Sequence, residues 1–471
     1  MNPDYADWLN PMLVKELRQG LRKSVFVSVF LLVQIAMVIL IGFRMLSAAS
    51  GADQMVGGFL DGVLWTGLGL ALLIIMPMRG LASITEEQKA NTLDLVQMTR
   101  MGSTGIVLGK WVAVMSQSLL IAVAVLPYAV LRYFFGGVDV VENLITLTAM
   151  ILGSAAATAL CLWLSTMPAA ARGIGVGLAI YLIPSLLVGS RMAPVFGMSS
   201  VANGSVFVWI YATIIMTIFL LELAASRIAP IAENHATRIR LIAVVGVVIA
   251  LLGSAMGATE WAVPRVILLL WASFEALTEL TSEVPSLYAP WASRGPVTRM
   301  VARTLYPGWA TGLLFTLAMM TVMIGNQMLF LPHPRSEQWQ PLIEGLIFWF
   351  ALIAPVAVLV LMPGVKFRGA IYFLVHLLCA FFFIVARTIN GSRSVATSLI
   401  DSLTPTSAAM AVMGGLTSSD NHWPFFTILT LPIGGCIAVF LFIRARKEFR
   451  LIREMEGRAL APESAALTSD A

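Results

Sequence analysis

The chain contains 471 residues, of which 59% are hydrophobic and only 12% are charged. A soluble globular protein carries about 25% charged residues, so this composition excludes a water-soluble fold, and we expect lipid to surround most of the chain. The formal net charge of +5 raises the question of nucleic-acid binding, but no basic run is interleaved with aromatic residues. We therefore predict an integral membrane protein that binds no nucleic acid.

Apolar runs long enough to cross a bilayer recur along the whole chain. Only helices or closed barrels satisfy the backbone in lipid, and these runs are too long and too uniformly apolar for barrel strands. Because a spanning helix needs about 20 apolar residues, we predict an all-α, polytopic transmembrane helical bundle with about twelve spans. The expected spans are 24–46, 58–78, 111–131, 143–165, 174–190, 205–225, 241–258, 264–281, 309–331, 341–363, 369–387 and 424–444.

The basic residues orient these spans. Lys and Arg gather in the cytoplasmic loops of membrane proteins. With the N-terminus inside, most of the 30 Lys and Arg residues fall in segments that then face the cytoplasm. We therefore expect both termini to lie in the cytoplasm.

The segment 10–23 predicts an amphipathic helix directly before the first span. Asn10 suits the helix cap and Pro11 the first turn. At about 100° per residue, apolar and basic residues fall on opposite faces. The apolar face holds Leu13, Leu17, Gly20 and Leu21, and the basic face holds Lys15, Arg18, Gln19 and Arg22. This pattern is typical of a helix in the membrane interface; the alternative is a basic flank that only orients the first span.

The cytoplasmic loop 79–110 is the most polar stretch between the predicted spans. Residues 83–86 and 85–88 match the capping box that begins a helix. A short helix with Leu93, Val96 and Met101 on one side would follow, and Gly102 would end it. We expect a compact helical hairpin suited to docking on a cytoplasmic partner, although a surface loop held only by its own chain is the alternative.

Two segments resemble the permeases of type-2 ABC exporters. The first is Asn10-Pro-Met-Leu-Val-Lys-Glu-Leu-Arg, and the second is Glu86-Glu-Gln-Lys-Ala-Asn-Thr-Leu-Asp-Leu-Val-Gln-Met-Thr-Arg, followed by Ile106-Val-Leu-Gly-Lys. The family pattern in the second segment is an acidic pair, Gly-Thr-Leu-Glu-Leu, Thr-Pro and a Gly-Lys that enters span three. The chain departs from it at Asn91, where Gly is usual, and at Arg100, where Pro is usual. The resemblance covers roughly residues 1–225.

In that family the N-terminal helix and the loop after span two contact the ATPase and transmit its closure to the spans. The resemblance therefore implies the permease subunit of an ATP-binding cassette exporter, energised by a separate ATPase chain that binds the ATP and magnesium. A second permease subunit or a second copy of this chain would complete the assembly in the bilayer. The implied coupling residues are Glu86, Glu87, Thr92, Leu93, Asp94, Leu95 and Thr99, and those of the interfacial helix are Lys15, Arg18 and Arg22.

The sequence predicts no catalytic, cofactor or metal site in the chain itself. The nearest approach to a phosphate loop, at 104–111, has Thr104 in place of the first Gly and Trp111 in place of the Ser or Thr that binds magnesium. The histidines and cysteines show no metal-ligand spacing. We therefore expect a transport subunit and not an enzyme.

Two other classes of protein stay open. A secondary carrier driven by an ion gradient suits the span count, although the Gly-rich basic signature expected between its second and third spans is missing. A polytopic protein with a structural or enzymatic role would place its chemistry at Glu275, Glu279 or His376.

The predicted organisation follows from these segments, and the expected location is the cytoplasmic (inner) membrane of a bacterium. The segments are the interfacial helix 1–23, a six-span permease-like unit 24–225 with the coupling loop 79–110, a basic cytoplasmic linker 226–240, a second six-span unit 241–444, and a basic, then disordered, cytoplasmic tail 445–471.

Overall fold

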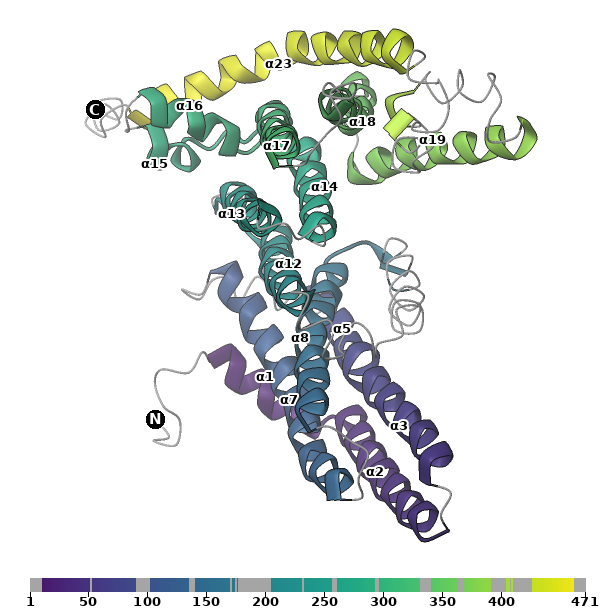
Figure 1. Ribbon diagram of the computed structural model, residues 1–471. Helices are drawn as coiled ribbons and strands as arrows, with labels where there is room; N and C mark the ends of the chain where they lie inside the picture. Colours follow the sequence, from purple (N-terminus) through teal and green to yellow (C-terminus); the bar gives the residue numbers. More distant parts are fainter. Residues whose placement is uncertain are drawn as a thin grey trace, which may run out of the picture. The chain divides into compact units, whose positions relative to one another are not determined.

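The computed structural model describes residues 11–50, 53–89, 102–134, 140–169, 172–173, 176, 205–230, 233–255, 261–292, 296–330, 340–362, 364, 368–390, 404–406, 408–409 and 426–460. All secondary structure in these residues is helical and none of them forms a strand, which confirms the all-α class. The chain divides into two compact units, Met1–Pro230 and Ile231–Ala471. Each unit is a set of long helices (Figure 1).

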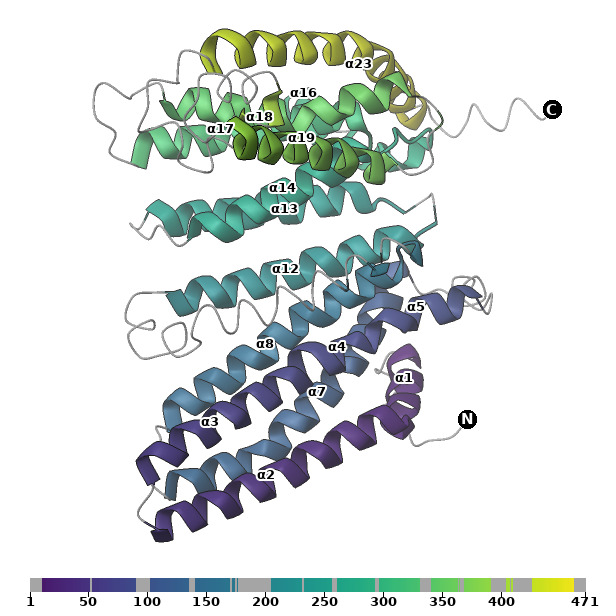
Figure 2. The ribbon, with the colours of Figure 1, turned by 90° about the vertical axis from the view of Figure 1, so that its right-hand side faces the viewer.

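The first unit, which we call unit 1, begins with a short helix followed by long ones. Figure 2 shows α1 lying across the ends of the long helices of this unit. The helices with their bounds are α1 (Pro11–Arg22), α2 (Ser24–Ser50), α3 (Asp53–Gly69), the π-helix η1 (Leu70–Ile75), α4 (Met76–Met78), α5 (Gly80–Lys89), α7 (Ser103–Phe134), α8 (Val140–Ser165) and α12 (Ser205–Ile228).

The second unit, unit 2, also combines long helices with short ones. The helices are α13 (His235–Ala255), α14 (Ala262–Thr278), η3 (Pro285–Leu287), α15 (Ala289–Ala292), α16 (Pro296–Leu305), α17 (Trp309–Phe330), α18 (Gln340–Leu361), α19 (Arg368–Asn390), η5 (Phe426–Thr430) and α23 (Leu431–Leu460). The short helices η3, α15 and α16 follow one another between α14 and α17, and η5 directly precedes α23.

Ten helices in the described part of the chain are long and apolar enough to cross a bilayer, and each overlaps one of the twelve predicted spans. Of the two remaining predictions, 174–190 lies outside the described residues apart from Val176. The other, 264–281, is α14, which has 17 residues and is about 26 Å long at 1.5 Å per residue. The chain is thus a multi-pass membrane protein, while its exact span count and the side of its termini stay predictions.

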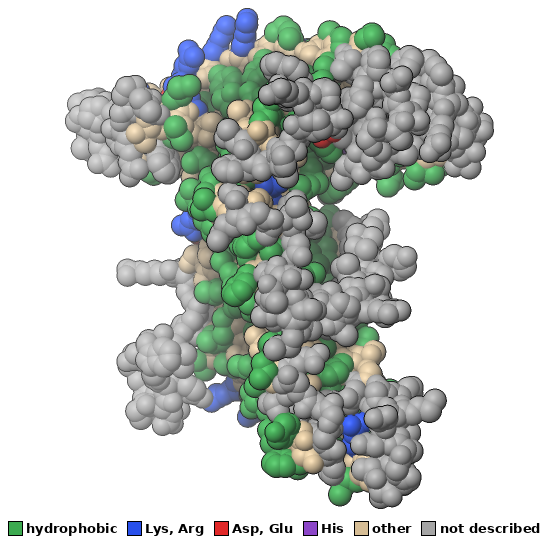
Figure 3. Space-filling model, viewed as in Figure 1, with side chains coloured by type: hydrophobic (Ala, Val, Ile, Leu, Met, Phe, Trp, Pro, Cys, Tyr) green, Lys and Arg blue, Asp and Glu red, His purple; other side chains and the backbone are tan. Residues whose placement is uncertain are grey.

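Large apolar side chains cover the outside of the long helices. Leu32 on α2 is 68% exposed, Phe207 on α12 is 64% exposed, and Leu377 on α19 is 68% exposed. Figure 3 shows hydrophobic side chains spread over the visible face of the molecule. Monomeric soluble proteins rarely expose contiguous apolar surface on this scale, so the pattern agrees with helices whose solvent is lipid.

The second span continues further than its apolar run predicts. It passes from α3 through η1 into α4, with Met76 N donating to Ala71 O, five residues back. π-Helices are rare and occur mostly as single turns inside α-helices, and this one ends two residues before Pro77, which has no N–H to donate. After one turn residue, Arg79, α5 extends the span to Lys89.

The capping boxes expected at 83–86 and 85–88 are therefore wrong. Ser83 and Thr85 lie inside α5, which begins at Gly80. The Thr85 hydroxyl donates to the carbonyl of Ser165 at 2.8 Å instead of capping its own helix. A hydroxyl with a partner elsewhere does not compete for the backbone of its own helix. The second half of the expected hairpin, 90–101, lies outside the described residues.

Two further segments differ from the predicted organisation. Most of the linker 226–240 that the structure describes is helical, because α12 ends at Ile228 and α13 begins at His235. The tail 445–471 is helical as far as Leu460, where α23 ends. Residues 461–471 lie outside the described part of the chain.

Candidate functional site

A buried lysine joins three helices of unit 1 that are far apart in the sequence. Lys110 Nζ on α7 lies 2.9 Å from Glu16 Oε1 on α1 and 3.1 Å from Glu87 Oε1 on α5. It also donates to the carbonyl of Ser83 at 3.3 Å. The Lys110 side chain is only 2% exposed. We call Lys15, Glu16, Glu87 and Lys110 the lysine cluster.

The lysine cluster provides hydrogen-bond acceptors and negative charge for the ammonium group of Lys110, which is costly to bury. A buried ammonium group is strongly destabilising unless it is paired and hydrogen-bonded. Lys110 has three N–H donors, and two carboxylates and one carbonyl accept from it. Lys15 Nζ lies 3.4 Å from Glu87 Oε1 and is half exposed. The two lysines and two glutamates balance in charge, so the cluster is neutral as a whole.

Local structure explains why Lys110 is buried. The apolar run of the third span begins at Trp111, but α7 begins eight residues earlier, at Ser103. Lys110 therefore lies well inside a helix whose first turns are packed. Ile106 and Val107 on α7 are fully buried against Ile84 on α5 and Leu162 on α8. The same apolar contacts hold α5 against α7 and α8.

A second contact holds the other end of α1. Arg79, at the turn between α4 and α5, donates to the carbonyl of Gly20 at 3.1 Å and to Gln117 Oε1 on α7. A Cβ atom on Gly20 would lie 2.2 Å from Gln117 Nε2. An alanine at this position would therefore require the flexible end of the Gln117 side chain to move. Arg79 also satisfies one of the last carbonyls of α1, which have no partner within the helix.

These two contacts connect α1 mechanically to the second and third spans. Glu16 and Gly20 lie one helical turn apart on α1, and each is held to α7 and to the region of Arg79 and α5. A displacement of α1 or α5 would therefore act directly on the ends of both spans that lie next to α1. Such a contiguous network of ion pairs and packed helices is the physical basis for coupling between distant sites.

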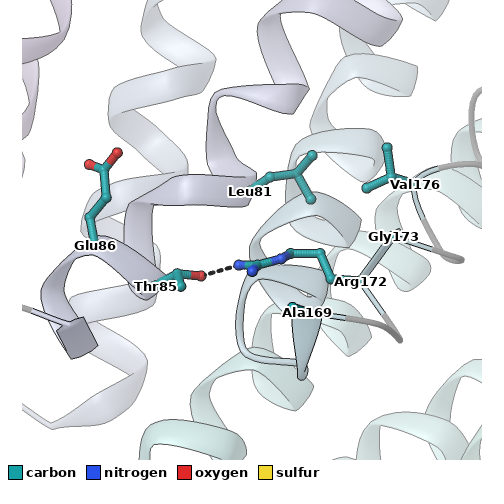
Figure 4. A pocket seen from close by; sticks show the side chains of 7 residues that line it. All are labelled: Leu81, Thr85, Glu86, Ala169, Arg172, Gly173 and Val176. Carbon is teal, nitrogen blue, oxygen red and sulfur yellow. Dashed lines mark hydrogen bonds between the residues drawn. The ribbon is translucent and has the colours of Figure 1, made fainter.

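An open pocket of about 480 Å³ lies beside the lysine cluster. Its wall combines one cation, one carboxylate and apolar side chains; the residues are Leu81, Thr85, Glu86, Ala169, Arg172, Gly173 and Val176. Figure 4 shows the guanidinium of Arg172 pointing to the Thr85 hydroxyl, with Glu86 pointing away from it. The pocket thus presents charges of both signs over apolar walls.

The residues predicted for coupling are distributed over three kinds of location. Glu87 lies in the lysine cluster, and Glu86 is exposed at the pocket. The basic residues predicted for the interfacial helix are all exposed on α1; they are Lys15, Arg18 and Arg22. The other five predicted residues lie outside the described part of the chain; they are Thr92, Leu93, Asp94, Leu95 and Thr99. The helix of α1 is present, but its position in the membrane interface stays a prediction.

Sequence reasoning missed the acidic and polar partners of these residues. Glu16 is the only acid in α1, and that isolation among basic residues was the available signal. Gln117 lies inside an apolar span, where a polar side chain is expected to have a partner. Gly20 was placed on the apolar face of α1, but its close contact with α7 could not be inferred from periodicity.

Unit 2 contains a second buried cation, Arg240. Its side chain is 1% exposed, and Nη2 lies 2.9 Å from Glu279 Oε2. Its other acceptors are the carbonyls of Thr304 and Gly308 at 3.0 Å and of Ala276 at 3.5 Å, and the Thr311 hydroxyl at 3.0 Å. We call this set the arginine hub. Sequence analysis placed Arg240 in the linker, but it lies inside α13 and joins α13, α14 and the start of α17.

The backbone at Gly308 completes the arginine hub. Gly308 has φ +125°, a conformation that side chains with a Cβ rarely adopt. Its carbonyl accepts from Arg240, while its N–H donates to Glu279 Oε2 at 3.3 Å. Glu279 thus contacts both the buried cation and the backbone of this turn.

The end of α23 packs against the short helices of unit 2. Arg303 on α16 binds Glu456 on α23 through two bonds, at 2.7 Å and 3.2 Å. The hydrogen bonds with Glu456 raise the pKa of Arg303. Beside them, burial raises the pKa of Tyr306 to about 12. Ile452 and Met455 of α23 are buried in the same cluster.

No His, Cys, Asp and Glu residues in the described part of the chain form a group of three that could hold a metal ion. Cys161, Cys379 and Cys436 are free thiols. The comparisons with known proteins give no further guide, because no family model, no curated protein and no solved structure matches the chain.

Proposed function

We propose that this chain is the membrane-spanning permease subunit of an ATP-binding cassette transporter, an exporter, in a bacterial inner membrane. A separate ATPase subunit would supply the energy. Its docking surface would be formed by α1, α5 and the pocket beside Glu86. Unit 2, a second permease subunit or a second copy of the chain would complete the transport pathway.

The lysine cluster is the observation that carries this proposal. The resemblance to exporter permeases rests on three short segments: the start of α1, the acidic pair on α5 and the Gly-Lys of α7. Each segment contributes a charged residue to the cluster, namely Glu16, Glu87 and Lys110. Segments that would receive and transmit force in a permease are thus linked by direct contacts.

The mechanism that follows is indirect. The ATPase pair closes on ATP and displaces α5 and α1. The lysine cluster and the Arg79 contact then transfer this displacement to α7 and to the second span, because they join these helices at two points. The spans rearrange and release the substrate on the outer side. Docking and transmission therefore rest on different residues, exposed Glu86 for the first and buried Lys110 for the second.

Affinity purification of the tagged chain from gently solubilised native membranes tests this function. We expect an ATP-binding cassette protein to copurify in a fixed ratio. Glu86→Lys should reduce its recovery, because it reverses an exposed charge on the docking surface. Glu454→Lys is the matched control, since Glu454 is equally exposed but lies on α23.

One result would replace the proposed function, and another would revise only its docking surface. A chain that purifies without an ATPase, under conditions that preserve known transporter complexes, would favour the secondary carrier, for which transport driven by a pH or sodium gradient would then be measured. Equal recovery of the ATPase with Glu86→Lys and Glu454→Lys would keep the permease but remove the pocket from its docking surface.

A further inference from the structure

We propose that unit 2 binds an oxyanion, a carboxylate or a phosphate group, at Arg265 near the start of α14. The charge distribution of the sequence places this end of α14 on the outer side of the membrane. The site is independent of the ATPase and of the docking surface in unit 1, so it goes beyond the proposed function.

Arg265 is buried where three helices of unit 2 meet. Its side chain is 5% exposed. Nη1 donates to Asn326 Oδ1 on α17 at 3.1 Å and to the Ser254 hydroxyl on α13 at 3.4 Å. Both partners are neutral. Among the described residues no carboxylate forms an ion pair with Arg265, so within this part of the chain its positive charge is hydrogen-bonded but not balanced.

The other deeply buried cations described above are balanced. Lys110 faces two glutamates, and Arg240 faces Glu279. An unpaired charge in a low-dielectric interior is strongly unfavourable. Ionisable groups inside membrane proteins are therefore expected to have a function, with a partner or substrate that compensates them. A bound anion supplies that compensation for Arg265.

The position of Arg265 in its helix strengthens this argument. Arg265 is the fourth residue of α14, and the N-cap residue, Trp261, makes no side-chain capping bond. The first turn of a helix carries unpaired N–H groups and a partial positive charge. A cation there is repelled, whereas an anion is attracted by both the helix end and the guanidinium.

One edge of the guanidinium makes no hydrogen bond to the described residues. Nη1 makes both of the hydrogen bonds, whereas Nε is buried without an acceptor among the described residues. The Nε and Nη2 donors form a fork that matches the two oxygens of a carboxylate or phosphate. The ligand is thus defined by chemistry, and it comes either from a small solute or from the head group of an anionic lipid.

The thermal midpoint of the purified chain in nanodiscs tests the site. Sodium phosphate and sodium acetate, each against sodium chloride at equal ionic strength, are the solute probes in phosphatidylcholine discs. Discs that contain phosphatidylglycerol are the lipid probe. We expect at least one probe to raise the midpoint of the wild-type chain, and the probe that does so identifies the source of the oxyanion.

Three variants make the test specific. Arg265→Gln removes the charge, and we expect an apparent Kd for the effective probe at least about tenfold weaker, which corresponds to about 1.4 kcal/mol. Asn326→Asp places a carboxylate at the position that Asn326 Oδ1 now occupies, 3.1 Å from Nη1. It should stabilise the chain and abolish the response, which separates ligand loss from misfolding. Arg44→Gln, at a buried arginine of unit 1, is the control and should respond like the wild type.

The proposal is overturned if no probe shifts the wild-type midpoint, or if Asn326→Asp responds to the probe as strongly as the wild type. Neither outcome depends on an ATPase, so the permease proposal is tested separately by copurification. A response lost in Arg44→Gln as well would show a general effect of arginine removal and would also overturn the site.

Discussion

The lysine cluster and the arginine hub each compensate a buried cation, but they do so with different partners. Lys110 binds mainly carboxylates from side chains of other helices, and one of them, Glu87, is shared with half-exposed Lys15. Arg240 binds three backbone carbonyls and a single carboxylate. Side-chain pairs can exchange partners when helices move, whereas backbone carbonyls are fixed by their own helices. Unit 1 thus has a joint suited to movement, and unit 2 has a rigid support.

Loss of the arginine hub should have the largest effect on stability. Arg240→Met removes the hydrogen bonds to α14, α17 and the preceding turn and leaves Glu279 without its cation. We expect the free energy of unfolding to fall by about 3 kcal/mol or more. Equilibrium unfolding in mixed micelles measures this loss. Arg240→Met with Glu279→Met should recover part of it, and a double variant as unstable as the single one would show that Glu279 is not the group left uncompensated.

Loss of the lysine should be less severe for stability. Lys110→Met leaves Glu16 and Glu87 without their buried cation, but it removes the donor of only one backbone carbonyl, that of Ser83, whereas Arg240→Met removes the donor of three. We expect a loss of about 2 kcal/mol, part of which Lys110→Met with Glu87→Gln restores by removing one of the two negative charges. The same unfolding measurement applies. A loss as large as that of Arg240→Met would contradict the distinction between the two sites.

Gly20→Ala should have a moderate effect that is confined to α1. The new Cβ would lie 2.2 Å from Gln117 Nε2, so the Gln117 side chain must move away from Arg79. We expect a loss of about 1 kcal/mol and faster amide hydrogen exchange in α1. Gly42→Ala is the matched control, because a Cβ at Gly42 meets no atom within 4 Å. Equal rates of amide hydrogen exchange in α1 of both variants would show that the close contact at Gly20 does not stabilise α1.

The exposed lysine of the cluster should have the smallest effect. Lys15 is half exposed and lies 3.4 Å from Glu87 Oε1, and such pairs are worth about 0.5 kcal/mol or less in water. Lys15→Gln should therefore leave the unfolding free energy almost unchanged. A loss comparable to that of Lys110→Met would show that charge at the surface, and not burial of Lys110, determines the stability of the cluster.

Hydropathy predicted the fold class and the position of ten spans, because each helix that crosses lipid needs about 20 apolar residues regardless of its neighbours. It could not predict contacts between helices. Glu16 and Lys110 are 94 residues apart in the sequence, and Arg303 and Glu456 are 153 apart. The end of the second span was predicted too early, since α5 is polar and its helical continuation depends on packing of Ile84 against α7 and α8.

Charge counting placed Arg240 and Arg265 near the membrane surface, although both are buried in unit 2. The local sequence of a loop or a helix end does not show which other helices will pack around it. The candidate site was predictable in part, because Glu87 was identified from a motif and the basic face of α1 from helical periodicity. Lys110, which joins the three helices of the site, is the last residue of that motif, but nothing in the sequence indicated that it would bind Glu16 on α1.

The most direct test of the account is ATP hydrolysis by the copurified complex in nanodiscs, compared between Lys110→Met and Glu454→Lys. Transmission through the lysine cluster predicts that both complexes assemble, because Lys110 is buried and Glu454 lies on α23, outside the docking surface. It predicts that Lys110→Met changes the hydrolysis rate severalfold while Glu454→Lys keeps the wild-type rate. An assembled Lys110→Met complex with the wild-type rate would contradict the central claim that this cluster couples the ATPase to the spans.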